Sequence, residues 1–325
     1  MSDAAAATVS LHDVEAARAA IGGRLHRTPT FTSRGLSELT GARVRLKAEL
    51  FQRTGSFKPR GVLTNLASLT PGEKARGVIG ISAGNHAAAL VYGAALEGVS
   101  SLLVMWQGAS EQKIEATRAY GADVDLAASG PGEAFDRLAE LTADSGRTLV
   151  HPFDSPPTIA GQGTVGLEIV EDVPDADVVV VPIGGGGLIA GVATAVKGHR
   201  PRARVIGVEP EGSNAMRAAL DAGAPVRLDP VSIADGLNAP FAGDNTLPIV
   251  RELVAEVVLV TEDEIADGMR FLYGRAKLAC EPAGAAATAA LLAGKIPHEQ
   301  GESVVVVVSG GNVASATAVA ILAGP

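Results

Sequence analysis

Short apolar runs alternate with segments of helical periodicity along most of the chain. This alternation is typical of βα units, in which parallel strands form a sheet and the intervening helices cover it. The apolar runs predict strands at Arg43 to Ala48, Gly77 to Ile81, Ser101 to Met105, Ala122 to Leu126, Asp177 to Pro182, Arg204 to Glu209, Glu256 to Val260 and Ser303 to Ser309. The helical segments predict helices at Leu11 to Ile21, Arg60 to Leu69, Gly84 to Glu97, Glu111 to Tyr120, Gly132 to Ala143, Leu188 to Gly198 and Glu262 to Leu278. The predicted fold class is α/β, with mainly parallel sheets flanked by helices.

Two features of this pattern concern organisation. The run Val304 to Val308 is apolar at every position, which predicts a central strand buried on both faces. The proline cluster from His151 to Pro157 predicts a domain boundary, because proline interrupts helices and strands. With a second crossing near residues 50–54, we expect a large domain of residues 1–50 and 151–325 and a small domain of residues 51–150.

Composition narrows the class of protein. The chain has 325 residues, 47% of them hydrophobic but only 3% aromatic, and a net charge of −9. This charge argues against a nucleic-acid partner. The start lacks the basic region and long apolar run of a signal peptide, and no uninterrupted 18-residue apolar stretch follows. We therefore expect a cytoplasmic protein without a membrane partner. The single cysteine, Cys280, has apolar neighbours and is expected to be a small buried hydrophobe.

Lys58 is the strongest candidate for chemistry. It is one of only seven lysines and lies in the run from Thr54 to Gly61, among small residues and the aromatic Phe57. A lysine becomes a nucleophile near neutral pH only when desolvation or nearby charge lowers its pKa. Pro59 disfavours helical angles at Lys58 and favours a helix start after it, so we expect the amine to project from a loop. An ordinary turn lysine remains the alternative.

Two glycine-containing turns follow predicted strands and precede predicted helices. Backbone N–H groups at a helix start attract anions, so the Ser82 turn, Ser82 to His86, is a candidate cradle for a substrate carboxylate. An ordinary capped turn is the alternative, and His86 by itself favours a helix-capping or packing role over a chemical one. The Gly184 turn, Gly184 to Leu188, contains four glycines that let a phosphate approach the backbone closely.

The Gly184 turn also supports a second hypothesis. Gly185, Gly187 and Ala190, followed by a strand that ends at Glu209, imitate the fingerprint of an NAD-binding oxidoreductase. That hypothesis leaves Lys58 without a role. A third turn places Ser309 at the end of an apolar strand, where open α/β sheets bind ligands. An amine, a carboxylate cradle, a phosphate cradle and a hydroxyl at one sheet edge indicate a phosphorylated aldehyde cofactor held as a Schiff base.

The same residues lie in sequence runs that resemble a known family. These runs are GSFKPRG (55–61), SAGNHA (82–87), IAGQGT (159–164), PIGGGGLIAG (182–191), ADG (234–236), EPAGA (281–285) and SGGN (309–312). Together they resemble the fold-type II pyridoxal-phosphate enzymes, and within them the branch of serine/threonine dehydratases (threonine ammonia-lyases) and serine racemases. The resemblance spans about Leu46 to Val313 in the same order. It implies the two-domain fold of tryptophan synthase β and, as the expected assembly, a homodimer.

The resemblance implies a role for each candidate residue. Lys58 would bind the cofactor, pyridoxal 5'-phosphate, and later remove the substrate's α-proton. For the cofactor, the resemblance implies that Phe57 packs on the ring, that Asn85 holds the ring's 3′-oxygen and that Ser309 meets the pyridine nitrogen. The cofactor's phosphate would be bound by Gly184, Gly185, Gly186, Gly187 and Leu188. The substrate's carboxylate would be bound by Ser82, Ala83, Gly84, Asn85 and His86, and Gly236 and Glu281 would lie near the ring and the substrate.

The expected reaction is β-elimination. A serine hydroxyl donates to a neutral pyridine nitrogen but does not protonate it, so a full carbanion is poorly stabilised and loss of the β-hydroxyl is favoured. L-Threonine and L-serine would give 2-oxobutanoate and pyruvate, with ammonia. A serine racemase and a dehydratase of another β-hydroxy amino acid such as 3-hydroxyaspartate remain alternatives, because the side-chain pocket is set by loops near Phe153, Asp154 and Leu237 to Phe241 whose conformations the sequence does not give.

Two positions depart from the family's patterns. Racemases carry a second serine where this chain has Ala83. Racemase-like members place an Asp six positions after the glutamate of their cation site, whereas Glu209 is followed by Ala215. Glu209 and a carbonyl near Ser213 are therefore only weak candidates, and we expect no metal site. The chain ends at Pro325, so we also expect no regulatory domain after the last glycine turn.

Overall fold

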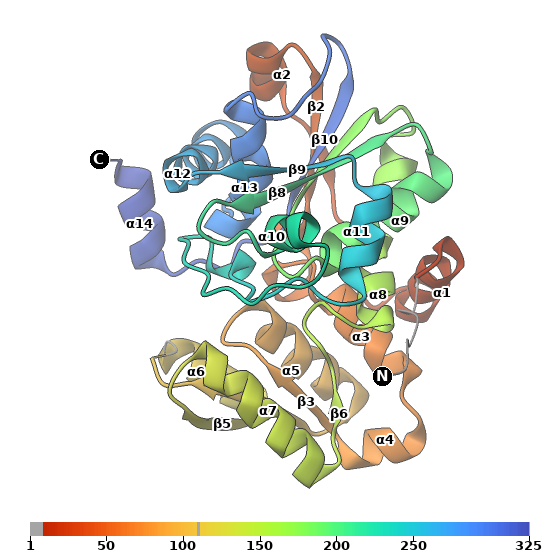
Figure 1. Ribbon diagram of the computed structural model, residues 1–325, viewed down its shortest axis with the longest axis vertical. Coiled ribbons are helices and arrows are strands. Elements are labelled where there is room, and N and C mark those ends of the chain that lie inside the picture. Colours follow the sequence, from red (N-terminus) through yellow and green to blue (C-terminus); the bar gives the residue numbers. More distant parts are fainter. Residues whose placement is uncertain (1–8, 109–110, 325) are drawn as a thin grey trace.

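The fold is α/β and contains two separate sheets (Figure 1). It was determined as a computed structural model that describes residues 9–108 and 111–324. Residues 1–8 and 325 of the predicted large domain, and 109–110 of the small one, lie outside the described residues. The two sheets are observed, whereas the division into domains stays a prediction.

The first sheet has six strands in the order β1-β2-β10-β7-β8-β9. They are β1 Thr30–Thr32, β2 Arg43–Ala48, β7 Val178–Pro182, β8 Arg204–Pro210, β9 Glu256–Val260 and β10 Ser303–Val308. All neighbours pair in parallel except β1, which is antiparallel to β2. The predicted central strand is confirmed, since β10 lies between β2 and β7 and all six of its residues are buried.

Helices cover both faces of this sheet. They are α1 Leu11–Ile21, α2 Arg34–Thr40, α8 Pro156–Asp172, α9 Gly187–His199, α10 Ala215–Ala222, α11 Thr246–Leu253, α12 Glu262–Phe271, α13 Pro282–Leu292 and α14 Ser315–Ala323. Val305 and Val307 pack into the core formed with α1, α8 and α9, whereas Val304 and Val306 pack into the core formed with α12 and α13. Successive side chains of a strand point to opposite faces, so an unbroken apolar run serves both layers.

The second sheet has four parallel strands in the order β5-β4-β3-β6. They are β3 Val78–Ile81, β4 Ser101–Trp106, β5 Asp123–Ala128 and β6 Thr148–Leu149. The helices between residues 59 and 145 are α3 Pro59–Ser68, α4 Pro71–Arg76, α5 Asn85–Glu97, α6 Glu111–Ala119 and α7 Pro131–Ser145. Short 3-10 turns η1 Glu49–Phe51, η2 Arg53–Gly55 and η3 Asp235–Leu237 complete the connections.

The sequence pattern did not predict several elements, and two of them were missed for the same reason. Helices α8 and α13 begin at Pro156 and Pro282, where proline occupies the first helical positions. Proline fits there because its missing N–H has no partner in the helix and its φ is already helical. The other elements not predicted were β1, β6, α2, α4, α10, α11 and α14. The helix predicted from Glu262 to Leu278 is shorter, since α12 ends at Phe271 and a π turn follows.

Two further expectations concern single features. Cys280 is fully buried, as predicted, and burial raises the pKa of its thiol to about 12. In the part of the chain that the structure describes, no helix has the length and apolar character needed to cross a membrane.

Candidate active site

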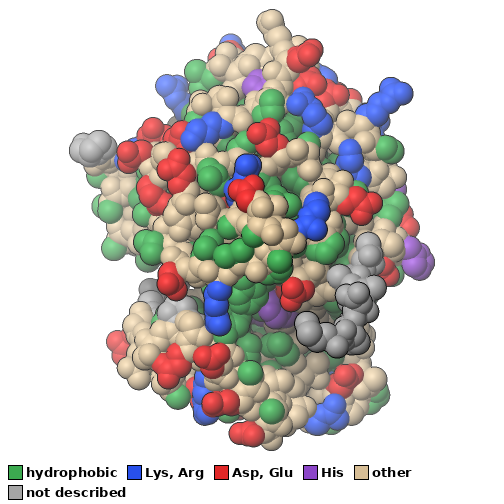
Figure 2. Space-filling model, in the orientation of Figure 1, with side chains coloured by type: hydrophobic (Ala, Val, Ile, Leu, Met, Phe, Trp, Pro, Cys, Tyr) green, Lys and Arg blue, Asp and Glu red, His purple; other side chains and the backbone are tan. Residues whose placement is uncertain are grey.

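A cavity of about 1130 Å³ lies between the two sheets, where several strands end. Figure 2 shows a hollow between the upper and lower parts of the molecule, with hydrophobic side chains inside it. Each residue to which a cofactor or substrate role was assigned from sequence lines this cavity: Phe57, Lys58, Ser82, Ala83, Gly84, Asn85, His86, Gly184, Gly185, Gly186, Gly187, Leu188, Gly236, Glu281 and Ser309. The fold therefore brings the predicted set together, while the role of each residue stays a prediction.

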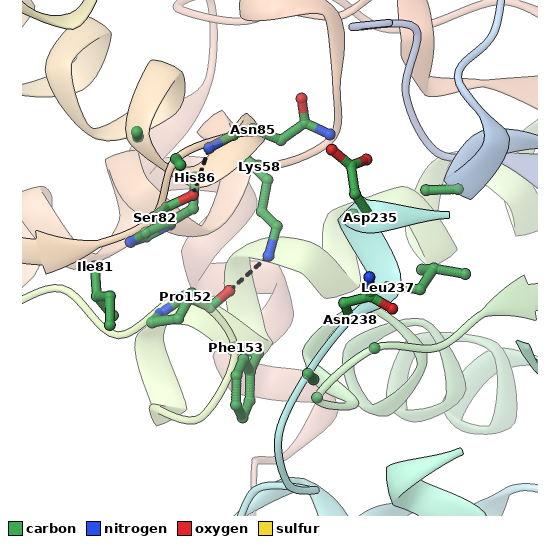
Figure 3. Close-up of a pocket in the computed structure, with 18 of the residues that line it drawn as sticks. Lys58, Ile81, Ser82, Asn85, His86, Pro152, Phe153, Asp235, Leu237 and Asn238 are labelled. Atoms are coloured by element: carbon green, nitrogen blue, oxygen red, sulfur yellow. Dashed lines mark hydrogen bonds between the residues drawn. The ribbon is translucent and has the colours of Figure 1, made fainter. Parts of the chain in front are cut away.

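The Lys58 amine projects into this cavity, where its Nζ donates a hydrogen bond of 2.8 Å to the Pro152 carbonyl (Figure 3). Nζ also lies 5.1 Å from the centre of the Phe57 ring. Burial lowers the pKa of the Lys58 amine to about 8, although the negative charge of Glu281 acts in the opposite direction. A lysine with this pKa is partly neutral near pH 7, as a nucleophile or base must be.

One local expectation at Lys58 was wrong. Its φ of −54° and ψ of −36° are helical, although Pro59 follows it. The Lys58 carbonyl accepts a hydrogen bond from the Val62 N–H at 3.3 Å, so the residue caps α3 rather than extending from a loop. The tertiary contacts of the helix start outweigh the local preference before proline.

The Ser82 turn joins β3 to α5 and presents side chains to the cavity. Ser82 Oγ accepts a hydrogen bond from the Gly84 N–H at 2.9 Å, and α5 begins at Asn85. The buried His86 Nε2 lies 2.9 Å from the Val150 carbonyl, so this nitrogen carries a proton and donates it. Burial, and then the charge of Lys58, lower the pKa of His86 to about 3. His86 is therefore neutral near pH 7, and its Nε2–H is used by the Val150 carbonyl.

The Gly184 turn joins β7 to α9 and presents backbone. Gly186 has a φ of +98°, a conformation that favours glycine. A Cβ on Gly185 would lie 2.3 Å from the Phe153 ring, and one on Gly187 would lie 2.6 Å from the Phe153 carbonyl oxygen. The first N–H groups of α9 have no partner within the helix, so they are available to an anion.

The remaining predicted residues lie where other elements meet the cavity. Ser309 follows β10, is 3% exposed, and its Oγ lies 3.4 Å from the Ala283 carbonyl, a long hydrogen bond. Glu281 caps the start of α13 and is also 3% exposed. Gly236 lies in η3, where an added Cβ would be 3.0 Å from the Cβ of Ala283.

The weak metal candidates do not line the cavity. Glu209 is fully buried, and its Oε1 and Oε2 accept hydrogen bonds from the N–H groups of Met216 and Arg217, at 2.8 and 2.9 Å. Its carboxylate therefore caps α10. Burial raises the pKa of Glu209 to about 8 against these two donors. Ser213 Oγ donates to the Leu237 carbonyl at 3.0 Å. Among the described residues no group of three or more His, Cys, Asp or Glu side chains could hold a metal ion.

Sequence reasoning missed several residues of the cavity. Asn312 and Gln162 lie within the runs SGGN and IAGQGT, which were noticed, but neither received a role. Gln162 is 1% exposed, and its Oε1 has no hydrogen-bond partner among the described residues. Asp235 lies in the run ADG, and Asn238 lies in the stretch from Leu237 to Phe241 that was expected to set the side-chain pocket, but neither residue received a role. Both lie across the cavity from Ser82 in Figure 3.

Comparisons with known proteins agree with this site. The family described as "Pyridoxal-phosphate dependent enzyme" matches residues 22–310. The L-threonine ammonia-lyase of Thermotoga maritima is 43% identical over 306 residues, which cover 94% of this chain and 76% of the relative. The catabolic L-threonine dehydratase of Escherichia coli is 43% identical over 307 residues, covering 94% and 93%. The structure of maize serine racemase superposes with a TM-score of 0.91 at 36% identity, with 95% of each chain covered.

Proposed function

The chain belongs to the pyridoxal-phosphate dependent enzymes, and from that membership we propose that it removes water from L-threonine, L-serine or both. The products are ammonia and 2-oxobutanoate or pyruvate. The observation that carries the proposal is the Lys58 amine, with its pKa lowered to about 8, in a cavity that the Ser82 turn and the Gly184 turn also line. Two dehydratases at 43% identity support the choice of substrate. The family gives no support to the dinucleotide hypothesis.

The cavity fits the cofactor in size and in donors. Its volume of about 1130 Å³ accommodates a phosphorylated pyridine ring and a small amino acid together. The glycines of the Gly184 turn carry no side chains, so a phosphate can approach the first N–H groups of α9 closely. We assign the phosphate to this turn, the aldehyde to Lys58, one ring face to Phe57 and the ring nitrogen to Ser309. When bound, the cofactor supplies a conjugated ring that accepts electron density from the substrate's α-carbon.

Lys58 is the proposed base. Its neutral Nζ accepts the α-proton, and the resulting ammonium can donate to the Pro152 carbonyl, which lies 2.8 Å from Nζ. The low pKa makes the neutral form accessible near pH 7, and the nearby carboxylate of Glu281 favours the protonated form that follows. Both protonation states of the amine are therefore available during one turnover.

Ser309 sets the outcome of the reaction. Its hydroxyl can donate to the ring nitrogen but leaves that nitrogen uncharged, so the ring withdraws electrons less strongly than a protonated ring. Negative charge at the α-carbon is then best relieved by departure of the β-hydroxyl with a proton, as water. The released unsaturated amine becomes an imine and takes up water, which gives the 2-oxo acid and ammonia.

The Ser82 turn orients the substrate. The N–H groups at the start of α5 and the Ser82 hydroxyl are the proposed donors to the substrate's carboxylate. His86 adds no charge there, because burial and then the charge of Lys58 lower its pKa to about 3. Its Nε2–H donates to the Val150 carbonyl rather than to the substrate. In this proposal the substrate's carboxylate binds at the Ser82 turn and the cofactor's phosphate at the Gly184 turn, and all of these residues line the same cavity as Lys58.

A panel of β-hydroxy amino acids tests the proposal directly. Purified holoenzyme is incubated with L-threonine, L-serine, 3-hydroxyaspartate and a bulkier analogue, and ammonia and 2-oxo acid are measured together. We expect stoichiometric release from threonine, serine or both. Release from 3-hydroxyaspartate alone would reassign the substrate, and no release from any of them would reject the dehydratase proposal.

Serine racemase is the second candidate, because the maize racemase has nearly the same fold at 36% identity. Racemisation needs a proton returned to the face of the α-carbon opposite Lys58. Ala83 has no proton to return, and the ring of His86 is committed elsewhere. We therefore rank racemisation second.

We further propose that the protein is a cytoplasmic homodimer with a small amino acid as its partner and no nucleic-acid or membrane partner. The net charge of −9 supports the exclusion of nucleic acid. Light scattering after size exclusion tests the assembly, for which twice the monomer mass is expected. Cell fractionation tests the location.

A further inference from the structure

Asn85 is held by two side chains that come from the other part of the molecule. It begins α5, beside the four-stranded sheet, and its Nδ2 donates to Glu281 Oε1 at 2.7 Å. Its Oδ1 accepts from Asn312 Nδ2 at 2.8 Å. Glu281 caps the start of α13, and Asn312 follows β10, so both belong to the elements of the six-stranded sheet. All three residues line the cavity.

The hydrogen bonds determine which way each carboxamide faces. Asn312 Nδ2 also donates to the Thr54 carbonyl at 2.6 Å, and a carbonyl only accepts, so the atom of Asn312 at this point must be its nitrogen. The atom of Asn85 that faces this nitrogen is then its oxygen, and the other atom, facing the carboxylate of Glu281, is its nitrogen. Asn85 has no freedom to exchange the two.

The backbone around Asn312 is shaped to hold it. Thr54 has a φ of +62°, which is unusual for a residue with a branched side chain. Gly55, with a φ of +76°, lies so close that an added Cβ would be 2.4 Å from Asn312 Oδ1. The Gly311 N–H donates to the Gly55 carbonyl at 2.9 Å. The strained backbone of Thr54 and the glycine at position 55 thus surround and position the carboxamide of Asn312.

A count of donors shows what remains for a ligand. Asn312 Nδ2 has two protons, and Thr54 and Asn85 accept both. Asn85 Nδ2 also has two protons, of which Glu281 accepts one. Among the described residues no other side chain or carbonyl accepts the second N–H of Asn85, so this N–H is left for the cavity.

We propose that Asn312 and Glu281 are positioning residues that orient the Asn85 carboxamide so that its second N–H donates to the ring oxygen of the bound cofactor. This inference rests on the cofactor assignment above. Neither residue needs to touch the cofactor. Because the donor comes from one sheet's elements and its holders from the other's, cofactor affinity depends on the two parts being closed on each other.

Cofactor affinity of the apoenzyme provides the test. Pyridoxal phosphate is titrated into apoenzyme of the wild type, N312D, N312A and N85A, and the dissociation constant is read from absorbance. An aspartate at position 312 has no N–H for Asn85 Oδ1, so Asn85 turns its nitrogen to the new carboxylate and its oxygen toward Glu281 and the cofactor. We expect N312D to weaken cofactor binding about tenfold. N312A leaves the Asn85 carboxamide free to adopt either orientation, so we expect it to weaken binding about threefold.

A double-mutant cycle distinguishes positioning from general structural damage. If Asn312 acts through Asn85, N312D costs no further affinity in an N85A background, whereas independent effects multiply. The pH at which the bound cofactor's absorbance changes should also shift in N312D and N85A by the same direction and amount. N214A serves as the matched control, since the Asn214 side chain makes no capping hydrogen bond, and it should bind like the wild type.

The outcomes separate the two proposals. Multiplicative losses in the double variant, or an N312A protein that folds and binds like wild type with an unshifted absorbance profile, would overturn the positioning role. A wild-type apoenzyme that takes up no pyridoxal phosphate would instead reject the cofactor assignment on which it rests. Thermal melting of each apoenzyme reports folding, and N312A keeps the test decisive if N312D does not fold.

Discussion

The two glycine-containing turns of the cavity connect the same kinds of element but differ in how much space surrounds their glycines. Both join a buried parallel strand to a helix, β3 to α5 and β7 to α9. In the Gly184 turn the glycines lie against Phe153, and a Cβ on Gly185 or Gly187 would collide with it. In the Ser82 turn a Cβ on Gly84 would meet only Ser82 Oγ, at 4.0 Å.

This difference separates two kinds of recognition. The Gly184 turn offers only backbone N–H groups, and the packing of its glycines against Phe153 leaves no room for side chains. It therefore suits a group that never changes, such as a cofactor phosphate. The Ser82 turn adds side chains with room around them, so its chemistry can change from one enzyme to another without collapse of the turn. We expect substitutions in the Gly184 turn to weaken cofactor binding strongly, and substitutions in the Ser82 turn to alter the reaction.

Removal of the Lys58 amine from the cavity that both turns line should have the largest effect. Lys58→Ala is expected to lower kcat/KM at least about a thousandfold and to eliminate the visible absorbance of the lysine-bound cofactor. Lys74→Ala, which removes a lysine paired with Glu97, should change neither. A wild-type protein without the absorbance band after reconstitution would contradict the assignment of Lys58.

A matched pair of substitutions tests the contrast between the turns. Gly187→Ala places a methyl group 2.6 Å from the Phe153 carbonyl oxygen, a backbone atom that cannot easily yield. We expect cofactor affinity to fall about a hundredfold, equal to about 2.7 kcal/mol. Gly84→Ala should leave cofactor affinity within about threefold, because its methyl group meets open space. Equal losses in equilibrium titrations of the two apoenzymes would refute the contrast.

The acidity of Lys58 predicts a pH profile. Burial lowers the pKa of this amine to about 8, so the neutral, reactive form increases with pH up to about 8 and then levels off. The rate of cofactor capture by apoenzyme should rise about tenfold per pH unit below that value. His86 and His151, whose pKa values burial lowers to about 3 and about 4, should not contribute above pH 5. A rate that keeps rising to about pH 10 would indicate an ordinary exposed lysine.

A smaller change is expected at the Ser82 turn. β-Elimination from L-serine should exceed racemisation at least about tenfold in the wild type, about 1.4 kcal/mol of barrier, because Ala83 returns no proton to the α-carbon. Ala83→Ser should raise the racemised fraction without lowering cofactor affinity. Chiral analysis of residual serine beside pyruvate release measures both. D-Serine formed by the wild type as fast as pyruvate would promote the racemase assignment.

Chelation should have the smallest effect. Ala215 supplies no oxygen ligand, and both oxygens of Glu209 accept backbone hydrogen bonds from α10. We expect EDTA to change activity less than about twofold, because a divalent cation at Glu209 would have to displace the N–H groups of Met216 and Arg217 from the carboxylate. A large loss that Mg²⁺ or Ca²⁺ restores would show that other ligands build a cation site.

Sequence reasoning located the site because each reactive group lies in a strong local signal. Lys58 stands beside a proline, the two turns are rich in glycine, and Ser309 ends the most apolar strand. Helices α8 and α13 were missed for the converse reason, because proline both interrupts helices and starts them, and only the following contacts decide which. The run ADG marked the stretch that contains Asp235 and Asn238, but the stretch has no periodicity, so the sequence did not show which of its side chains face the cavity.

The sequence by itself determined the fold class, the family and the identity of the candidate chemical groups, because periodicity and glycine placement are local properties. Only the tertiary structure decided their physical state. The pKa of Lys58 depends on burial and on Glu281, which is more than two hundred positions away in the chain. The orientation of Asn85 depends on Asn312 across the cavity, and the need for Gly187 depends on Phe153. Desolvation, charge proximity and collision are properties of distances in space, which spacing along a chain does not contain.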